Sequence, residues 1–397
     1  MNRIHSLKNN NSSRVEELIT SLSDKQLRSK RSGIRADVEK INFPVHYCIN
    51  LNPPITTYKL LDVNATILKN AIKQLEDRTC LQFYYRSPCH TTNEYPYRLI
   101  YFVANTKIRI NEYNFTYTSK VPNPYYIKIE DKCNKQVGCF LKKILAYLGF
   151  FLTHKRSDRD DYITVNDSNI ISEYKYEYDK FTYNSSLADI GYDFGSVMHV
   201  SKFYRNFWFG DTFKTKLSPY YELMTGQEYG LSFSDYKFIN YRYCQESCFN
   251  AVKCERGGYP NSDSCRYCEC PNGFAGLQCE ILDNSTLGCG QNQLNASSQL
   301  STLNFSGIET CNVLITAGIG IKIKIVVTLA HLPPGNPCFE KQALEIKHRK
   351  DKSLTGLCLC TYASNVTLES EDHEVFIQYN GKDKNHNAKI EYQAITS

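Results

Sequence analysis

Cysteine content is the feature that most constrains how this chain can fold. The sequence holds 17 cysteines in 397 residues, and 12 of them follow position 240 at short intervals. Cysteines at that density are typical of disulfide-linked proteins of the secretory pathway and are rare in reducing compartments. We therefore expect a disulfide framework and a secreted, extracellular protein. The odd count leaves at least one thiol unpaired or joined to another chain.

Length and charge narrow the class of protein further. A chain of 397 residues predicts two or three domains, and 42% hydrophobic with 22% charged residues is ordinary globular chemistry. The net charge of +6 is spread without a long basic block, which argues against a nucleic-acid partner. No stretch reaches the roughly 18 apolar residues of a membrane span. The first residues also lack the apolar run of a signal peptide. We expect the true start to lie upstream, with unconventional export as the alternative.

Two kinds of modification site agree with secretion. Asn-x-Ser/Thr sequons are weak signals singly. The expected glycosylation sites are Asn64, Asn114, Asn166, Asn184, Asn284, Asn295, Asn304 and Asn365. The polar segment 1–31 ends in the sequence RSKR, which is typical of a dibasic processing site. We expect cleavage after Arg31, so that this segment behaves as a propeptide; a solvent-exposed basic patch is the alternative.

Hydrophobic periodicity predicts the elements of the first domain. From Phe43 onward, apolar and polar residues alternate as they do in half-buried strands. Residues 65–80 place apolar side chains at helical spacing, and residues 133–151 do the same. The stretches CLQFYYR and YRLIYFVAN read as strands. Helices and strands therefore mix in the region before Cys244.

The second predicted helix runs into a motif that is specific for one family. The astacin zinc proteases extend their active-site helix as G-F-x-H-E-x-x-R-x-D-R-D-x-Y, and this chain matches that pattern at Gly149, Phe150, Arg156, Asp158, Arg159, Asp160 and Tyr162. The sequence SVMHV at 196–200 is similar to the family's Met-turn, S-x-M-H-Y. DRTCLQFYYR and the stretch ending at Cys244 resemble the first cysteine-bearing strand and the end of the family's domain. Residues from about 40 to 244 thus resemble an astacin domain. We expect Gly149 to permit a turn after the helix through a positive φ. We also expect the charged residues that follow, from Arg156 to Asp160, to pair with one another and fix that turn.

The resemblance implies a secreted zinc metalloendopeptidase made as a zymogen, but the catalytic positions differ. Aligned on Gly149, the family's zinc-ligand positions fall on Lys142, Ala146, Leu152 and Val200. The general-base position falls on Lys143, and the Met-turn methionine is kept as Met198.

These replacements remove the chemistry of the family. Catalytic zinc needs three protein ligands with lone pairs and an open position for water. An ammonium at 142 repels a dication, and Ala146 and Leu152 have no donor atom. Without zinc the water is not acidified, and Lys143 cannot accept its proton as a carboxylate does. We predict no zinc cofactor and no catalysis.

Three functional hypotheses remain open. The first is an inactive astacin homologue that acts as an extracellular binding protein, with a protein or glycan partner that the sequence does not identify. The second is an active zinc metalloendopeptidase with unorthodox metal binding through His154 or His199. The third is a chain that is losing function. The lysines at 142 and 143 predict a cationic cleft floor, unless both extend to solvent.

The tail resembles two extracellular modules. Residues 248–279 end in the spacing C-x-C-x8-C with GFAG inside, which is similar to an EGF-like module. The family pairing there would be Cys248–Cys265, Cys254–Cys268 and Cys270–Cys279. A zinc site is the competing interpretation of such clustered cysteines. The rest of the tail resembles a CUB domain, a β-sandwich with Cys289–Cys311 as a plausible pair and Cys338 joined to Cys360 or Cys358.

The expected organisation follows from these resemblances. It comprises a propeptide-like segment (1–31), an astacin-like domain (32–244), an EGF-like module (245–280) and a CUB-like β-sandwich (281–397). The astacin-like domain would be an α+β metzincin fold with a twisted mixed sheet and an active-site helix, closed by a Cys80–Cys244 bond. The family's second disulfide departs here: Cys133 lacks its usual partner, and Cys48, Cys89 and Cys139 are unranked candidates.

Overall fold

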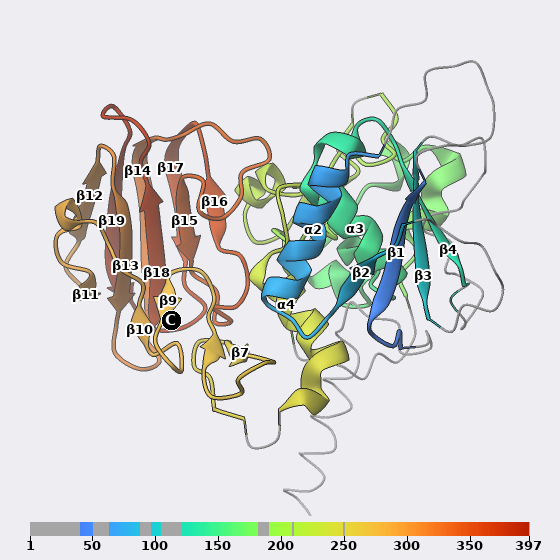
Figure 1. The fold of residues 1–397 in the computed structure, drawn as a ribbon. Helices are drawn as coiled ribbons and strands as arrows, with labels where there is room; N and C mark the ends of the chain where they lie inside the picture. Colours follow the sequence, from blue (N-terminus) through green and yellow to red (C-terminus); the bar gives the residue numbers. More distant parts are fainter. Residues whose placement is uncertain are drawn as a thin grey trace, which may run out of the picture.

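A computed structural model shows how the chain is arranged (Figure 1). The described residues are 40–50, 63–87, 97–104, 121, 123–181, 190–208, 210–248 and 251–396. Several sequence predictions lie outside these ranges: the segment 1–31 with its processing site at Arg31, Cys89, and the sequons at Asn114 and Asn184.

The N-terminal domain, which comprises the described residues from 40 to 244, is built on a sheet of strand order β2-β1-β3-β4. The strands are β1 (Val45–Asn50), β2 (Phe83–Tyr85), β3 (Leu99–Ala104) and β4 (Tyr125–Ile129). All pairings among the described strands of this sheet are parallel, so these strands do not include the antiparallel strand of a mixed sheet. β3 is buried along most of its length, as parallel strands covered on both faces are.

Two helices, α2 (Ala65–Asp77) and α3 (Val137–Tyr147), pack against each other beside this sheet (Figure 1). In α2 the buried residues are Leu68, Ala71, Ile72 and Leu75, which confirms the apolar stripe expected from the sequence. Asn64 caps α2 by accepting from two backbone amides of its first turn. The second helix was predicted to start at Cys133, but Cys133–Lys135 form a separate 3-10 turn and α3 begins later.

The second half of the N-terminal domain is mostly loops and short 3-10 turns. Its regular elements are the antiparallel pair β5 (Ile163–Val165) and β6 (Phe213–Thr215), followed by α4 (Phe233–Ile239). Ser232 and Asp235 form a capping box at the start of α4. The Cys80–Cys244 bond, with a sequence separation of 164, joins the end of the first helix region to the end of the domain.

A cysteine-rich segment, residues 248–279, links the two larger parts. Its strands are short: β7 (Tyr259–Pro260) pairs with β8 (Cys268–Glu269), and β9 (Phe274–Ala275) pairs with β10 (Ile281–Leu282), just beyond the segment. Its disulfides are Cys248–Cys265, Cys254–Cys268 and Cys270–Cys279. Because so small a unit buries few apolar side chains, these bridges supply much of its stability.

The C-terminal β-region, residues 281–396, consists of two packed sheets (Figure 1). One has the order β11-β13-β18-β15-β16, with strands Gln293–Asn295, Thr310–Thr316, Glu374–Asn380, Leu344–Lys347 and Leu357–Leu359. The other has the order β12-β19-β14-β17, with strands Ser301–Ser306, Asn387–Ile395, Lys322–His331 and Tyr362–Glu369. The bonds Cys289–Cys311 and Cys338–Cys360 lie in this region.

The burial pattern of the β-region shows where it meets its neighbours. In β14 buried and partly exposed residues alternate, as expected for a strand with one face on a core. In β18 five successive residues are buried. The cysteine-rich segment covers its second face, where the rings of Phe274 and Phe376 lie 5.0 Å apart.

The β-region also packs directly against the N-terminal domain through a junction segment, residues 347–356. The Arg349 guanidinium donates to the carbonyl of Tyr192 at 2.6 Å, and the Thr355 hydroxyl donates to the carboxylate of Asp193 at 3.1 Å. All four residues are buried at this interface. The two domains are therefore joined by buried polar contacts as well as by the chain.

Close packing at the junction predicts a stability effect. A Cβ added to Gly195 would lie 2.5 Å from Thr355 Oγ1, inside any acceptable contact. We expect Gly195→Val to lower the free energy of unfolding by about 1–3 kcal/mol, the usual cost of overpacking. Gly318→Val is the control, because there an added Cβ meets nothing nearer than 3.5 Å. Equal denaturation midpoints for the two variants would show that the junction is not packed as described.

Candidate functional site

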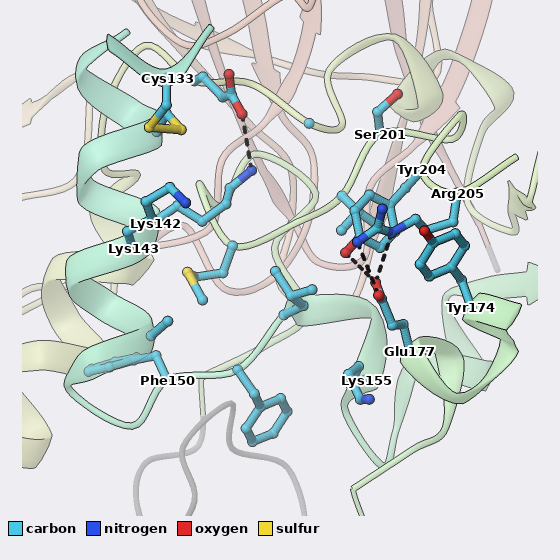
Figure 2. A pocket seen from close by; sticks show the side chains of 18 of the residues that line it. Cys133, Lys142, Lys143, Phe150, Lys155, Tyr174, Glu177, Ser201, Tyr204 and Arg205 are labelled. Atoms are coloured by element: carbon cyan, nitrogen blue, oxygen red, sulfur yellow. Dashed lines mark hydrogen bonds and ion pairs between the residues drawn. A yellow bond between two sulfur atoms is a disulfide. The ribbon is translucent and has the colours of Figure 1, made fainter. Parts of the chain in front are cut away.

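A cleft of about 770 Å³ opens beside α3 in the N-terminal domain (Figure 2). Its volume lies within the range that ligand-binding pockets usually have. The cleft is lined by all the positions that the sequence alignment assigned to zinc and its supports: Lys142, Lys143, Ala146, Leu152, Met198 and Val200. The fold thus gathers these residues at one place.

Helix α3 supplies the cleft wall that carries the two lysines. Lys142 and Ala146 are separated by one helical turn and so face the same side. Lys142 is 9% exposed and Lys143 is 7% exposed. The alternative that both side chains extend to solvent is therefore wrong, and the cleft floor is cationic.

Lys142 is paired across the cleft with an acid. Its ammonium lies 3.6 Å from the carboxylate of Glu228, the contact marked by a dashed line in Figure 2. Burial lowers the pKa of Lys142 below its ordinary value, and the carboxylate of Glu228 partly offsets that effect. An ammonium held in this way occupies the place where a zinc ligand would be needed.

The other ligand positions offer no donor atoms. Ala146, Leu152 and Val200 are buried hydrocarbon side chains, and the thioether of Met198 lies among them. No histidine lines this cleft among the described residues. In the same part of the chain, no group of three or more His, Cys, Asp or Glu side chains is placed to hold a metal ion. The residues present do not fit the zinc ion that the alignment implies.

The two histidines near the cleft are engaged elsewhere. His199 is fully buried, with Nδ1 donating to the carbonyl of Val200 at 2.8 Å and Nε2 accepting from the Tyr192 hydroxyl at 2.9 Å. His154 donates from Nε2 to the carbonyl of Glu177 at 3.0 Å. Burial lowers the pKa of both imidazoles, that of His199 to about 4. Both ring nitrogens of His199 are therefore occupied, whereas Nδ1 of His154 is buried and makes no hydrogen bond.

The buried state of His199 predicts a pH effect. Its folded pKa of about 4 lies below the ordinary value of 6.5, so its stabilising contribution is complete above pH 6.5 and is lost as the pH falls toward 4. We expect His199→Asn to flatten the dependence of unfolding free energy on pH in that window by about 1.4 kcal/mol per pH unit. Denaturant titrations across this window measure the slope. An unchanged slope would mean that the imidazole is accessible to protons in the folded state.

The turn after α3 has the form that the motif predicted. Gly149 has φ of +88°, a backbone conformation that favours glycine, which confirms the expected turn. Arg156, only 1% exposed, binds both carboxylate oxygens of Asp158 at 2.8 Å. It also donates to the carbonyls of Ile190 and Gly191. The predicted pairing within this cluster is therefore present, and it ties the turn to the chain that precedes the Met-turn.

Two buried carboxylates hold the Met-turn that carries Met198. Asp235 accepts from the Ser196 hydroxyl at 2.6 Å and from the Val197 amide at 2.9 Å. Asp193 accepts from the Gly195 amide at 2.8 Å and also receives the junction contact from Thr355. Burial raises the pKa of Asp235 to about 6. The cleft floor is thus fixed from behind by the N-terminal domain and the β-region together.

A polar cluster on the opposite rim was not foreseen from the sequence. The carboxylate of Glu177 accepts from the Tyr204 hydroxyl and pairs with the Arg205 guanidinium at 3.1 Å (Figure 2). Arg205 also lies 4.0 Å from the ring centroid of Tyr174. These residues come from two short segments, 174–177 and 204–205, that match no motif, so only the fold shows that they form one cluster.

The remaining predicted site residues are cysteines and sequons. The structure pairs Cys133 with Cys139. Cys358 is buried without a disulfide partner among the described residues. Cys48 is buried in β1 and donates to the carbonyl of Arg86. The described sequon asparagines are all exposed: Asn64, Asn166, Asn284, Asn295, Asn304 and Asn365. In the described residues no helix is long and apolar enough to cross a membrane.

The chain is similar in sequence to several known proteins. The chain is 31% identical over 357 residues to zinc metalloproteinase nas-34 of Caenorhabditis elegans, a match that covers 89% of this chain and 56% of that protein. It is 33% identical over 253 residues to nas-30 of the same organism, covering 61% of this chain and 34% of that protein. The chain therefore spans only part of the length of these relatives.

A solved structure and a family model complete the comparison. High choriolytic enzyme 1, a hatching enzyme zinc-protease from Oryzias latipes, matches with 24% identity and a TM-score of 0.38 over 50% of this chain and 88% of that one. The model of the astacin peptidase family matches residues 55–244. These residues contain α3, the Met-turn and the whole cleft. Over residues 55–244, the chain therefore carries an astacin domain.

Proposed function

We infer that this chain is a secreted astacin homologue that performs no zinc-dependent proteolysis and acts as an extracellular binding protein through its cleft. The observation that carries this inference is the lining of the cleft. Where the family needs zinc ligands and a general base, this chain has an ion-paired lysine, a second buried lysine and hydrocarbon side chains. The cleft itself remains open and of ligand-binding size.

The chemistry of the lining supports the loss of catalysis. Peptide hydrolysis by this family's route requires a metal to acidify water and a carboxylate to take up its proton. Lys143 is a base only when it is neutral, and Lys142 adds positive charge where a dication would bind. No step of hydrolysis can be assigned to the residues that line this cleft.

The tail supports an extracellular role. We assign residues 245–280 to an EGF-like module and 281–397 to a CUB-like domain, after a propeptide-like segment (1–31) and the astacin-like domain (32–244). Two interleaved disulfides followed by a third in the cysteine-rich segment, together with the two-sheet architecture of the β-region, favour this assignment. The disulfides and the exposed sequons favour secretion and glycosylation.

The proposal is tested by a protease assay. The purified protein, processed after Arg31 if it matures there, is incubated with gelatin and a mixed peptide substrate, with added zinc and with a metal chelator. We expect no cleavage above that of a mock preparation in either condition. The relatives named zinc metalloproteinases define the competing function, an active enzyme with unorthodox metal binding. Chelator-sensitive cleavage that copurifies with the protein would establish that competing function.

A further inference from the structure

The two lysines of the cleft floor are the least expected feature of this molecule. Lys142 and Lys143 are adjacent on α3, both line the cleft, and both are buried. Taking an ammonium out of water costs several kcal/mol unless an anion compensates it. The buried ammonium of Lys142 therefore favours negative charge beside it.

The pairing of Lys142 leaves room for a second anion. Glu228 is its single carboxylate partner among the described residues, and their separation of 3.6 Å is longer than a charge-assisted hydrogen bond. The ammonium has three donors, and one carboxylate at this distance does not use them. Figure 2 shows the Lys142 side chain reaching from α3 into the open part of the cleft.

The charged side chains among the described residues that line the cleft are mostly basic. The basic side chains that line it are Lys128, Lys132, Lys142, Lys143, Lys155 and Arg205. The acidic ones are Glu130, Glu177 and Glu228. Of these acids, Glu177 is committed to Tyr204 and Arg205, and Glu228 to Lys142. Among the described lining residues, basic side chains therefore outnumber acidic ones, which favours anionic ligands in the cleft.

Apolar surface lies directly beside this charge. Ala146, Leu152, Met198 and Val200 line the same floor as Lys142. A ligand that satisfies both features presents a carboxylate next to an apolar group. Peptides do this wherever Asp or Glu precedes a large hydrophobic residue, whereas sulfated sugars offer anions without an apolar side chain.

We propose that the cleft binds an acidic peptide segment, with one carboxylate on the ammonium of Lys142 and the following apolar side chain over Ala146 and Leu152. The proposal rests on the proposed function, since an active protease would cleave such a segment rather than hold it. The carboxylate of Glu228 neutralises Lys142 in the empty cleft. When the peptide is bound, Glu228 and the peptide carboxylate both contact the Lys142 ammonium.

The test compares matched ligands on the full-length protein. The probes are a fluorescein-labelled pool of hexapeptides with Glu followed by Leu, Ile or Phe, the same pool with Gln in place of Glu, and a sulfated oligosaccharide. Binding is followed by fluorescence anisotropy at low and at physiological ionic strength. We expect the Glu pool to bind at least about tenfold more tightly than the Gln pool and to weaken as salt rises.

Variants assign the binding to the cleft. Lys142→Met, which keeps the length of the side chain, should lower the affinity for the Glu pool by at least about thirtyfold. Lys389→Met, an exposed lysine of β19, is the matched control and should change nothing. Similar melting temperatures for both variants and the wild type would verify that the variants are folded.

The possible results distinguish failure of the carboxylate site from failure of the proposed function. Equal binding of the Glu and Gln pools, or an unaffected Lys142→Met variant, overturns the carboxylate site but leaves a peptide-binding cleft. Binding of the sulfated oligosaccharide alone, or of no probe, also overturns it. Metal-dependent cleavage of the pool overturns the proposed function itself.

Discussion

Restoring the family's residues is expected to turn the cleft into a zinc site. The variant combines Lys142→His, Lys143→Glu, Ala146→His, Leu152→His and Val200→Tyr. Because all five positions line one cleft, their new side chains should converge on one ion. We expect one zinc per chain with a dissociation constant below about 1 µM, or more than about 8 kcal/mol of binding free energy. Isothermal titration and metal analysis measure it.

The same design without Ala146→His is the control. It leaves two of the three histidine ligands, which is too few for a stable tetrahedral site, so we expect its affinity for zinc to fall sharply. A complete variant that folds but takes up no zinc would contradict the account. It would mean that the register set by Gly149 is wrong, although that residue has the positive φ that the register demands.

Loss of the Arg156 side chain is expected to be the most destabilising single change in the N-terminal domain. Its guanidinium is buried, holds Asp158 with two hydrogen bonds, and satisfies two backbone carbonyls before the Met-turn. Arg156→Ala leaves a buried carboxylate without its cation. Such a change costs about 3–5 kcal/mol of unfolding free energy, which denaturant titration followed by circular dichroism measures.

Two further substitutions make this prediction specific. Arg156→Lys keeps the charge but loses the planar fork, so it should lie between Arg156→Ala and the wild type. Arg266→Ala, at an exposed position of the cysteine-rich segment, should change stability by less than about 0.5 kcal/mol. If Arg156→Ala proved as mild as Arg266→Ala, the cluster would have no structural role.

Much of the local structure could be predicted because it is encoded locally. The apolar stripe of α2 and the positive-φ glycine after α3 follow from sequence spacing. The family of the domain followed from ordered motifs, which the match over residues 55–244 confirms. The convergence of the altered zinc positions also follows, because the motif itself encodes the geometry of the cleft.

What escaped prediction depends on contacts between distant segments or on local geometry that periodicity does not report. Lys142, in helix α3, is held inside the cleft by its pairing with Glu228, which lies in a loop far along the chain. The chain around Cys133 forms a 3-10 turn where a helix start was predicted, and its disulfide with Cys139 could not be ranked by counting cysteines. Hydrophobic periodicity describes one segment at a time, so it does not predict which other segment of the chain will pack against that segment.

The junction between the domains is a second example. Residues 347–356 connect β15 to β16 in the β-region, yet they reach the chain that supports the Met-turn. Hydrogen bonds from Arg349 and Thr355 cross this interface. The tail therefore contributes to the back of the cleft, in addition to any binding surface of its own.

The zinc content of the purified protein tests most directly whether this cleft can hold catalytic zinc. The purified wild-type protein is equilibrated with excess zinc, passed through a desalting column and analysed by inductively coupled plasma mass spectrometry. The account predicts zinc far below one ion per chain, with the same value after Lys142→Met. One ion per chain, retained after desalting and removed only by a chelator, would contradict it.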